Sequence, residues 1–315
     1  NEFFKMTFSE IGATITSWQS KNRFGMFEHI ALSYQNEHLF LENEQFLSAV
    51  IGPYAGRIYP AKIFIDGKTY DLEKNFLNDI CLHSGKQGLY KKKFKVIEVT
   101  NSKIIFTYVQ KEKESSYPGN RTYEITYEIL EDTLHQTFKT LTDQNTFTNL
   151  CNHTHFNLSG NFKTNILNHE LFIPAKTYGK LNEKFIAEHI ENVDATFDFR
   201  KSKRLKQSIM ELKKTPQKGL DHPFILDGNQ IELYDPLSKR LLIVRTNQDA
   251  VVIYTHNFTL NQIYQPNIQE KEHISICIET QHFPNDIHLI EEKRSHHPKD
   301  QPHIQKTSYQ IIIKE

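Results

Sequence analysis

The stretch from Thr122 to Leu130 reads TYEITYEIL, and its pattern decides the fold class of the chain. Apolar and polar residues alternate along its whole length. The apolar residues fall on one face of an extended chain, and they are Tyr123, Ile125, Tyr127 and Ile129. A two-residue period is typical of an antiparallel strand with one buried and one solvated face. The stretch therefore predicts a half-buried strand.

Short segments with the same period occur along much of the chain. The clearest are Lys103–Val109, Leu134–Leu141, Ile274–Ile278 and the closing Tyr309–Ile313. Leu241–Val244 and Val251–Tyr254 flank Asn247-Gln248-Asp249, so we predict that they pair as a hairpin. Many short strands separated by turn residues are typical of a β-sandwich.

Convincing helices are scarce in this sequence. Lys201–Lys214 is the best candidate, because its leucines and isoleucine recur at roughly helical spacing. Glu291–Gln305 lacks periodicity and is predicted to be a long surface loop. Strands and helices do not alternate, which argues against a doubly wound nucleotide-binding sheet. We therefore predict an all-β fold, a large antiparallel β-sandwich with few short helices, as a single domain over residues 1–315.

The composition argues against several classes of function. The 38 Lys and Arg balance the 38 Asp and Glu, so the chain lacks the net basic charge typical of nucleic-acid binding. No run approaches the roughly 18 apolar residues of a membrane span. Three widely spread cysteines argue against a disulfide scaffold, and Asn1–Lys5 does not read as the start of a signal peptide. We therefore expect a cytoplasmic protein with no nucleic-acid or membrane partner.

Five segments combine unusual polar residues with glycines or with an apolar strand. The chain has only 12 glycines, and six of them fall in four of these segments. The segments are GPYAGRI at Gly52–Ile58, LHSGKQG at Leu82–Gly88, NHTHFNLSG at Asn152–Gly160, GLDHPF at Gly219–Phe224 and IETQHFP at Ile278–Pro284. Glycine marks tight turns and close approach of the backbone, so the polar residues beside it are candidates for a site.

Most of these residues also have a purely structural explanation. Arg57 could form a surface ion pair, and Asp221, two residues before a proline, could start a turn. Glu279 is harder to explain in this way. The isoleucines of residues 274–278 predict a buried face, and Glu279 lies where their strand is expected to end. A buried carboxylate is costly unless it is paired or functional.

Taken together, the segments resemble the aldose 1-epimerase family, also called galactose mutarotases. The resemblance runs from Ile11 to Pro284. Seven motifs match in order, namely Gly56-Arg57-Ile58, Leu82-His83-Ser84-Gly85 preceded by Asn75, Asn152–Gly160, Thr196–Arg200, Asp221-His222 with Phe224, Tyr254–Asn257 and Glu279–Pro284. Any one match would be weak, whereas seven in order are specific.

The resemblance implies a mutarotase-like supersandwich with an open sugar cleft. It also implies a reaction without metal or organic cofactor, in which the α and β anomers of a free hexose interconvert. By position, Glu279 corresponds to the general base and His153 to the general acid of the family. Arg57, His83 and Asp221 correspond to its substrate-positioning residues. The implied partner is a monosaccharide, bound by a monomer or a homodimer.

These residue types suit the chemistry that the resemblance implies. Opening a sugar ring removes the proton of the C1 hydroxyl while a proton reaches the ring oxygen. A carboxylate and a protonated imidazole supply both transfers. An aspartate and the forked guanidinium of an arginine suit the remaining hydroxyls. His155 occupies a place that is often aromatic in the family, so the resemblance gives it no catalytic role.

Two alternatives concern ions. Cys81, Cys151 and Cys277 each lie two residues before a predicted site residue, so together with histidines they could form a zinc site. They are equally explained as small buried residues packed beneath the cleft. The basic cluster within Lys201–Lys214 could bind the phosphate of a hexose 6-phosphate, or it could be a solvated helix face.

Two further alternatives concern the reaction itself. A glycoside hydrolase would use two carboxylates, here Asp221 and Glu279, but it leaves the Asn152–Gly160 segment without a role. A sugar sensor would have the same fold and bind the sugar without converting it. The intact Glu279 and His153 argue against a sensor.

Overall fold

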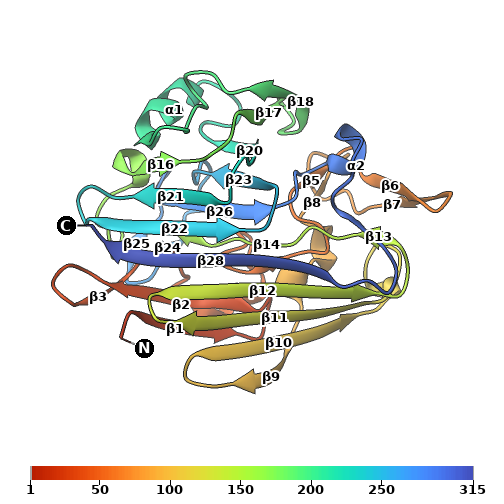
Figure 1. The fold of residues 1–315 in the computed structure, drawn as a ribbon, viewed down its shortest axis with the longest axis horizontal. Coiled ribbons are helices and arrows are strands. Elements are labelled where there is room, and N and C mark those ends of the chain that lie inside the picture. The colour runs from red at the N-terminus through yellow and green to blue at the C-terminus, as the bar shows by residue number, and fades with distance from the viewer. Residues whose placement is uncertain (1, 315) are drawn as a thin grey trace.

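A computed structural model describes residues 2–314 and shows two large antiparallel sheets (Figure 1). The larger sheet has nine strands in the spatial order β19 (Lys203–Arg204), β16 (Glu170–Phe172), β21 (Gln230–Tyr234), β22 (Arg240–Thr246), β28 (His303–Ile313), β12 (Thr133–Thr142), β11 (Arg121–Leu130), β10 (Lys103–Gln110) and β9 (Lys95–Val99). β11 contains the TYEITYEIL stretch, and its predicted apolar face is the more buried one. The prediction of an all-β sandwich is confirmed.

The second sheet packs against the first and carries Asp221 and Glu279, two of the five candidate site residues. Its six strands follow the order β15 (His155–Phe156), β26 (Ile276–Gln281), β23 (Ala250–Tyr254), β20 (Asp221–Ile225), β17 (Thr177–Leu181) and β18 (Ala187–Asn192). One apolar cluster joins the two sheets and includes Ile125 of β11, Ile253 of β23 and Ile278 of β26. Burial of this apolar surface is the main force that holds the two sheets together.

Shorter elements surround the two large sheets. A three-stranded sheet comprises β1 (Phe4–Ser9), β2 (Thr14–Lys21) and β3 (Phe27–His29). Five strand pairs follow, namely β4 (Val50–Ile51) with β14 (Cys151–Asn152), β5 (Arg57–Ile58) with β8 (Cys81–Leu82), β6 (Lys62–Ile65) with β7 (Lys68–Asp71), β13 (Thr146–Phe147) with β27 (His296–His297), and β24 (Ile263–Tyr264) with β25 (Ile268–Gln269). The α-helices are α1 (Leu205–Leu212) and α2 (Asp286–Leu289). None of the helices within residues 2–314 has the length and apolar character needed to cross a membrane.

Strand alternation gives the six-stranded sheet two chemically different faces. In β26, Ile278 joins the core whereas Glu279 lines a cavity on the other side. In β23, Ile253 joins the core whereas Tyr254 lines the same cavity. Successive side chains of a strand point to opposite faces. The apolar pattern that builds the core therefore also directs the polar residues into the cavity.

The predicted hairpin between Leu241–Val244 and Val251–Tyr254 is wrong. Both strands exist, as β22 and β23, but they lie in different sheets: β22 pairs with β21 and β28, and β23 pairs with β20 and β26. The intervening Asn247–Asp249 carries the chain from one sheet to the other. Both strands are buried on both faces along most of their length, so their apolar runs held no information about partners.

Two element boundaries also differ from the prediction. The helix predicted at Lys201–Lys214 is the shorter α1, because Lys203 and Arg204 instead form the edge strand β19. The segment Glu291–Gln305 is not all loop, since it contains β27 and the first residues of β28.

The strand that carries Glu279 is longer than predicted. Glu279 does not lie at its exit, because β26 continues through Thr280 to Gln281 and both of these polar residues are buried. Thr280 contacts the hydroxyl of Thr307 over 2.7 Å. Because Thr280 and Gln281 are polar although they are buried, the strand continues beyond its apolar pattern, which is why the sequence placed its end too early.

Candidate active site

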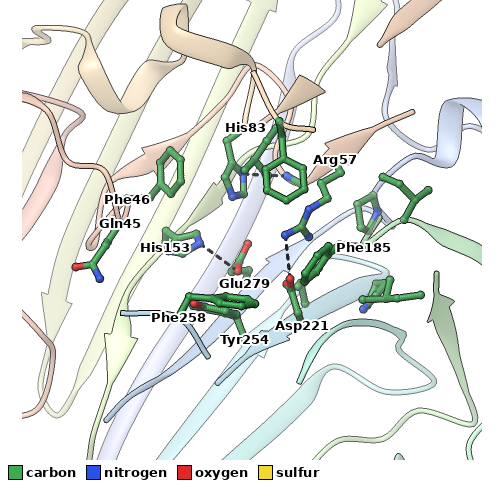
Figure 2. A pocket seen from close by; sticks show the side chains of 18 of the residues that line it. Gln45, Phe46, Arg57, His83, His153, Phe185, Asp221, Tyr254, Phe258 and Glu279 are labelled. Atoms are coloured by element: carbon green, nitrogen blue, oxygen red, sulfur yellow. Dashed lines mark hydrogen bonds and ion pairs between the residues drawn. The ribbon is translucent and has the colours of Figure 1, made fainter. Parts of the chain in front are cut away.

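A cavity of about 390 Å³ opens on the face of the six-stranded sheet that points away from the core. All five residues singled out from the sequence line it, namely Arg57, His83, His153, Asp221 and Glu279. Figure 2 shows their side chains converging on one space. The fold thus brings together five residues that are widely separated in the sequence, and their roles stay a prediction.

Glu279 and His153 form the centre of the site (Figure 2). Glu279 lies on β26, and His153 directly follows β14. Glu279 Oε1 and His153 Nε2 are 3.4 Å apart, and the two residues are only 3% and 5% exposed. The thiol of Cys151 donates to Glu279 Oε2 over 3.5 Å, and Cys277 Sγ lies 3.7 Å from His153 Nδ1. A carboxyl and an imidazole are therefore held in contact with each other. A cysteine thiol also contacts each of them.

Burial shifts the pKa values of this pair in opposite directions. Burial raises the pKa of Glu279 to about 8, with a further increase from the charge of Asp221 and opposition from Cys151 and Arg57. Burial lowers the pKa of His153 to about 4. Between these two values the pair holds a single proton. Such a pair can release a proton to one atom and accept one from a neighbouring atom.

Arg57 and Asp221 form an ion pair beside this centre. Arg57 begins β5, and its Nη2 donates to Asp221 Oδ2 over 2.9 Å. The guanidinium also contacts two aromatic rings that touch each other, and it lies 5.2 Å from the centroid of Phe76 and 5.3 Å from that of Phe185. Burial raises the pKa of Asp221, and the charge of Arg57 opposes this shift. The pair is held rigidly enough to orient the hydroxyls of a bound polyol.

His83 is held by a local turn that requires glycine. Gly56 has a φ of +81°, and a Cβ on it would lie 2.6 Å from Cβ of Pro284. The backbone N–H of Gly56 donates to His83 Nδ1 over 3.1 Å. Burial and the neighbouring charges of His153 and Arg57 lower the pKa of His83 well below its ordinary value. The ring is therefore neutral, with its proton on Nε2, and serves as a hydrogen-bond donor.

Aromatic residues of the cavity were missed in the sequence. Phe46 packs against the rings of His83 and His153, with centroids 4.7 and 5.7 Å apart. Phe185 and Phe258 also line the cavity, and their centroids are 6.0 Å apart. The chain has 22 phenylalanines, and no local pattern distinguishes these loop residues from those of the core. Aromatic walls with a few convergent polar groups are typical of small-molecule sites.

The zinc site suggested by the three cysteines does not assemble as a unit. Cys81 packs in a separate apolar cluster, where burial raises its pKa to about 12. The ligand atoms of His153, His155 and Cys277 do lie within 4.8 Å of one another. However, burial raises the pKa of the Cys277 thiol well above its ordinary value, and the two imidazoles already contact each other over 3.2 Å. The trio is accounted for as a hydrogen-bonded cluster.

The basic cluster near α1 lies apart from the cavity. None of its lysines or arginines is among the described residues that line the cavity. The charged residues of that lining are Glu44, Arg57, Asp221 and Glu279. The only cation of this set is therefore Arg57, which is already paired with Asp221.

Comparison with known proteins agrees with this geometry. The sequence model of the family "Aldose 1-epimerase" matches residues 1–310. The chain belongs to the aldose 1-epimerase family. Human galactose mutarotase is 31% identical over 284 residues, which cover 88% of this chain and 82% of the human protein. Aldose 1-epimerase of Escherichia coli is 27% identical over 264 residues, which cover 80% of this chain and 75% of that protein. As a member of this family, the chain is an isomerase.

Two solved structures share the fold of this family member. An aldose epimerase homologue from C. elegans has a TM-score of 0.93 at 20% identity and covers 100% of this chain and 97% of its own. Galactose 1-epimerase from Lactobacillus acidophilus has a TM-score of 0.86 at 23% identity, with 100% and 93% covered. At these identities the likeness establishes the supersandwich fold alone.

Proposed function

We propose that this protein is an aldose 1-epimerase that interconverts the α and β anomers of a free hexose without a metal or organic cofactor. The observation that carries the proposal is the contact of 3.4 Å between Glu279 and His153 in an open cavity. Membership of the aldose 1-epimerase family points to the same reaction.

The pair suits a reaction at two atoms that share one carbon. The C1 hydroxyl and the ring oxygen are both bonded to C1, so a base and an acid in contact can reach both. Glu279 takes the proton of the C1 hydroxyl, His153 gives its proton to the ring oxygen, and the bond between C1 and the ring oxygen breaks to leave an aldehyde. Rotation about C1–C2 presents the other face, and the same groups close the ring in reverse.

The proton that His153 donates comes from within the pair. Without sugar, burial favours the state in which Glu279 holds the proton. Sugar hydroxyls that donate to the carboxylate favour its ionised form, and the proton then moves to His153 across the 3.4 Å contact. Because the pair holds one proton in both states, this activation requires no exchange with solvent.

Arg57, His83 and Asp221 would hold the sugar in place during these steps. The carboxylate of Asp221 accepts from hydroxyls, while Arg57 and the Nε2–H of His83 donate to sugar oxygens. Their fixed geometry matters because a displacement of about 1 Å at the reacting atoms can cost about 10²-fold in rate.

The alternative functions receive less support from the site. A phosphorylated hexose would find Arg57 as the only cation among the described lining residues, and Asp221 already neutralises it. A glycoside hydrolase would need Asp221 as a free carboxyl, whereas it accepts from Arg57 over 2.9 Å. A sensor would not require a perturbed acid–base pair at the centre of its cavity.

The proposal extends to the setting of the enzyme. We propose a cytoplasmic monomer or homodimer, built as one domain, whose partner is a monosaccharide. Cys81, Cys151 and Cys277 are free and buried, which suits a reducing compartment.

Exchange NMR on equilibrated sugars tests the proposal directly. We expect magnetisation transfer between the α and β anomeric protons of glucose or galactose on addition of enzyme, and little transfer with Glu279→Gln. Glucose 6-phosphate and a nitrophenyl glycoside serve as the comparison substrates. Faster exchange on the phosphate ester would favour the hexose-6-phosphate epimerase, release of nitrophenol would favour a hydrolase, and binding without exchange would favour a sensor.

A further inference from the structure

A hydrogen-bonded row of buried side chains starts at His153. His153 Nδ1 lies 3.2 Å from His155 Nε2, and His155 Nδ1 lies 3.0 Å from Ser275 Oγ. Ser275 Oγ in turn lies 3.2 Å from His256 Nδ1. All four residues are at most 5% exposed. The acid–base reaction proposed above uses only the first of them.

The row ends at the carboxylate of Glu270. His256 Nε2 lies 2.9 Å from Glu270 Oε1, and the hydroxyl of Tyr264 donates to the same oxygen over 2.8 Å. The backbone N–H groups of Leu260 and Gln262 donate to Oε2 over 2.7 and 2.9 Å. Burial alone would raise the pKa of Glu270, but its hydrogen bonds, that from His256 foremost, lower the pKa to about 2. Glu270 is therefore ionised and can only accept.

An acceptor at one end sets the direction of every hydrogen bond in a row when each imidazole carries a single N–H. His256 must donate from Nε2, so its Nδ1 accepts from the hydroxyl of Ser275. The oxygen of Ser275 then accepts from Nδ1–H of His155, which leaves Nε2 of His155 as an acceptor. Burial lowers the pKa of His155 well below its ordinary value, so this ring stays neutral. His153 must therefore donate from Nδ1.

The opposite direction is disfavoured by charge. It would either require His256 to hold two protons, which places a cation 3.4 Å from His155 Nδ1, or leave the buried Nδ1 of His256 without a donor. Glu270 does not need that cation, because neutral donors already satisfy its oxygens. The backbone carbonyl of Gln45, which also faces the His155 ring, would be the acceptor in that disfavoured state.

We propose that His155, Ser275, His256 and Glu270 form a positioning relay that keeps one proton of His153 on Nδ1. His153 Nε2 is then the only nitrogen that exchanges a proton with the sugar and with Glu279. The inference rests on the proposed function, in which His153 is the general acid. Its residues act through His153 rather than on the sugar.

The relay also stabilises the charged state of His153. When the shared proton moves from Glu279 to His153, every donor in the row already points toward the ionised Glu270. Hydrogen bonds aligned in this way polarise one another, so the imidazolium is favoured without rearrangement of the relay. When His153 has given its proton from Nε2, the same alignment keeps the remaining proton on Nδ1, so Nε2 can accept a proton again.

The tautomer of His153 tests the relay without turnover. In protein with ¹⁵N-labelled histidine at neutral pH, we expect the Nδ1–H form of His153. His155→Phe fills the same place with an aromatic ring and removes both hydrogen bonds, so the population should shift toward the Nε2–H form. We expect kcat to fall ~10- to 100-fold while KM changes less than about threefold. Ser275→Ala should cause a smaller loss of the same kind.

A matched control separates positioning from loss of packing. His297 is as buried as His155, at 1% exposed, and its ring also contacts two partners, Thr148 and Gln301. His297→Phe should lower the melting temperature without changing kcat or the His153 tautomer. The relay is wrong if the parent enzyme shows the Nε2–H form of His153, or if His155→Phe leaves both tautomer and kcat unchanged.

The outcomes distinguish the relay from the proposed function. Absence of anomer exchange by the parent enzyme overturns the function, whatever the tautomer of His153. If His153 carries its proton on Nε2 and anomer exchange still depends on Glu279, the relay is wrong and the proposed epimerase reaction stands.

Discussion

Two clusters of histidines and carboxylates in this protein are built alike. The central cluster comprises Glu279, His153, His155, His256 and Glu270, and the peripheral cluster comprises Asp249, His282, His303 and His297. In each cluster two imidazole nitrogens lie 3.2 Å apart. In each, a carboxylate pairs with a ring, Glu270 with His256 and Asp249 with His282.

The two clusters differ in where they end. The central cluster ends at Glu279, whose pKa is raised to about 8 and whose carboxyl faces a cavity. The peripheral cluster does not reach that cavity, and its last ring, His297, contacts Thr148 Oγ1 over 2.8 Å and Gln301 O over 2.7 Å. A carboxylate–imidazole row is therefore not itself a site. It gains a chemical use where one end is a perturbed group that faces a space for substrate.

The largest expected effect is a loss of turnover when the acid–base pair of Glu279 and His153 is changed. Glu279→Gln keeps size and shape but removes the proton acceptor, so we expect a loss of ~10²–10⁴-fold. His153→Gln should behave likewise, and the double variant should not multiply the two losses because both groups act in one proton exchange. Polarimetric kinetics measures each loss.

The peripheral cluster supplies the control for this experiment. His303→Gln removes a ring of similar surroundings, and turnover should stay within about twofold of the parent. Melting curves establish that each variant is folded. A folded Glu279→Gln enzyme with near-normal turnover would show that the base is another residue.

A smaller effect is expected at Asp221, which we propose holds the sugar. Asp221→Asn removes the charge that pairs with Arg57 over 2.9 Å, so both binding and rate should suffer. We expect KM to rise and kcat to fall, each by roughly tenfold. Asp249→Asn in the peripheral cluster is the matched control, and equal kinetic losses in the two variants would contradict the assignment of Asp221.

The pH dependence of kcat/KM should report the perturbed pair. Below pH about 4 His153 is protonated as well as Glu279, so neither group of the pair can act as a base. Above pH about 8 Glu279 loses the shared proton, and no acid remains. We expect a bell-shaped profile with limbs near these values. A profile that stays flat from pH 4 to pH 9 would mean that the pair does not control the rate.

The same shift predicts a pH-dependent difference in stability. Glu279 keeps its proton to pH about 8 in the folded state, whereas a glutamate in the unfolded chain loses it near its ordinary pKa of 4.5. The parent therefore loses stability relative to Glu279→Gln as pH rises from 4.5 to about 8, by on the order of a few kcal/mol. Denaturant unfolding at several pH values measures the difference. One domain predicts a single transition, and a parent that gains stability relative to Glu279→Gln with rising pH would contradict the raised pKa.

The smallest expected effect is that of chelation. We expect turnover to be unchanged after dialysis against a chelator, since proton transfer to and from the oxygen atoms of the sugar requires no metal. Metal analysis of the purified protein provides the independent measurement. Loss of activity that zinc restores would instead assign a metal to the His153, His155 and Cys277 group.

Local sequence pattern was enough to establish the fold class and the chemical candidates. The two-residue period of TYEITYEIL predicted a half-buried strand, because a strand must separate apolar from polar side chains when one face is buried. Seven motifs in order predicted the family and the five residues that now line one cavity. These inferences depend on residue type and spacing, which can be read directly along the chain.

The pairing of strands and the surroundings of each candidate depend on the three-dimensional arrangement. β22 and β23 are neighbours in sequence but belong to different sheets, because two-sided burial erases the alternation that would reveal a partner. The aromatic walls and the row from His153 to Glu270 join loops and strands that are far apart in the chain. Their effect on pKa values depends on burial and on distances of about 3 Å, and no spacing along the sequence encodes either.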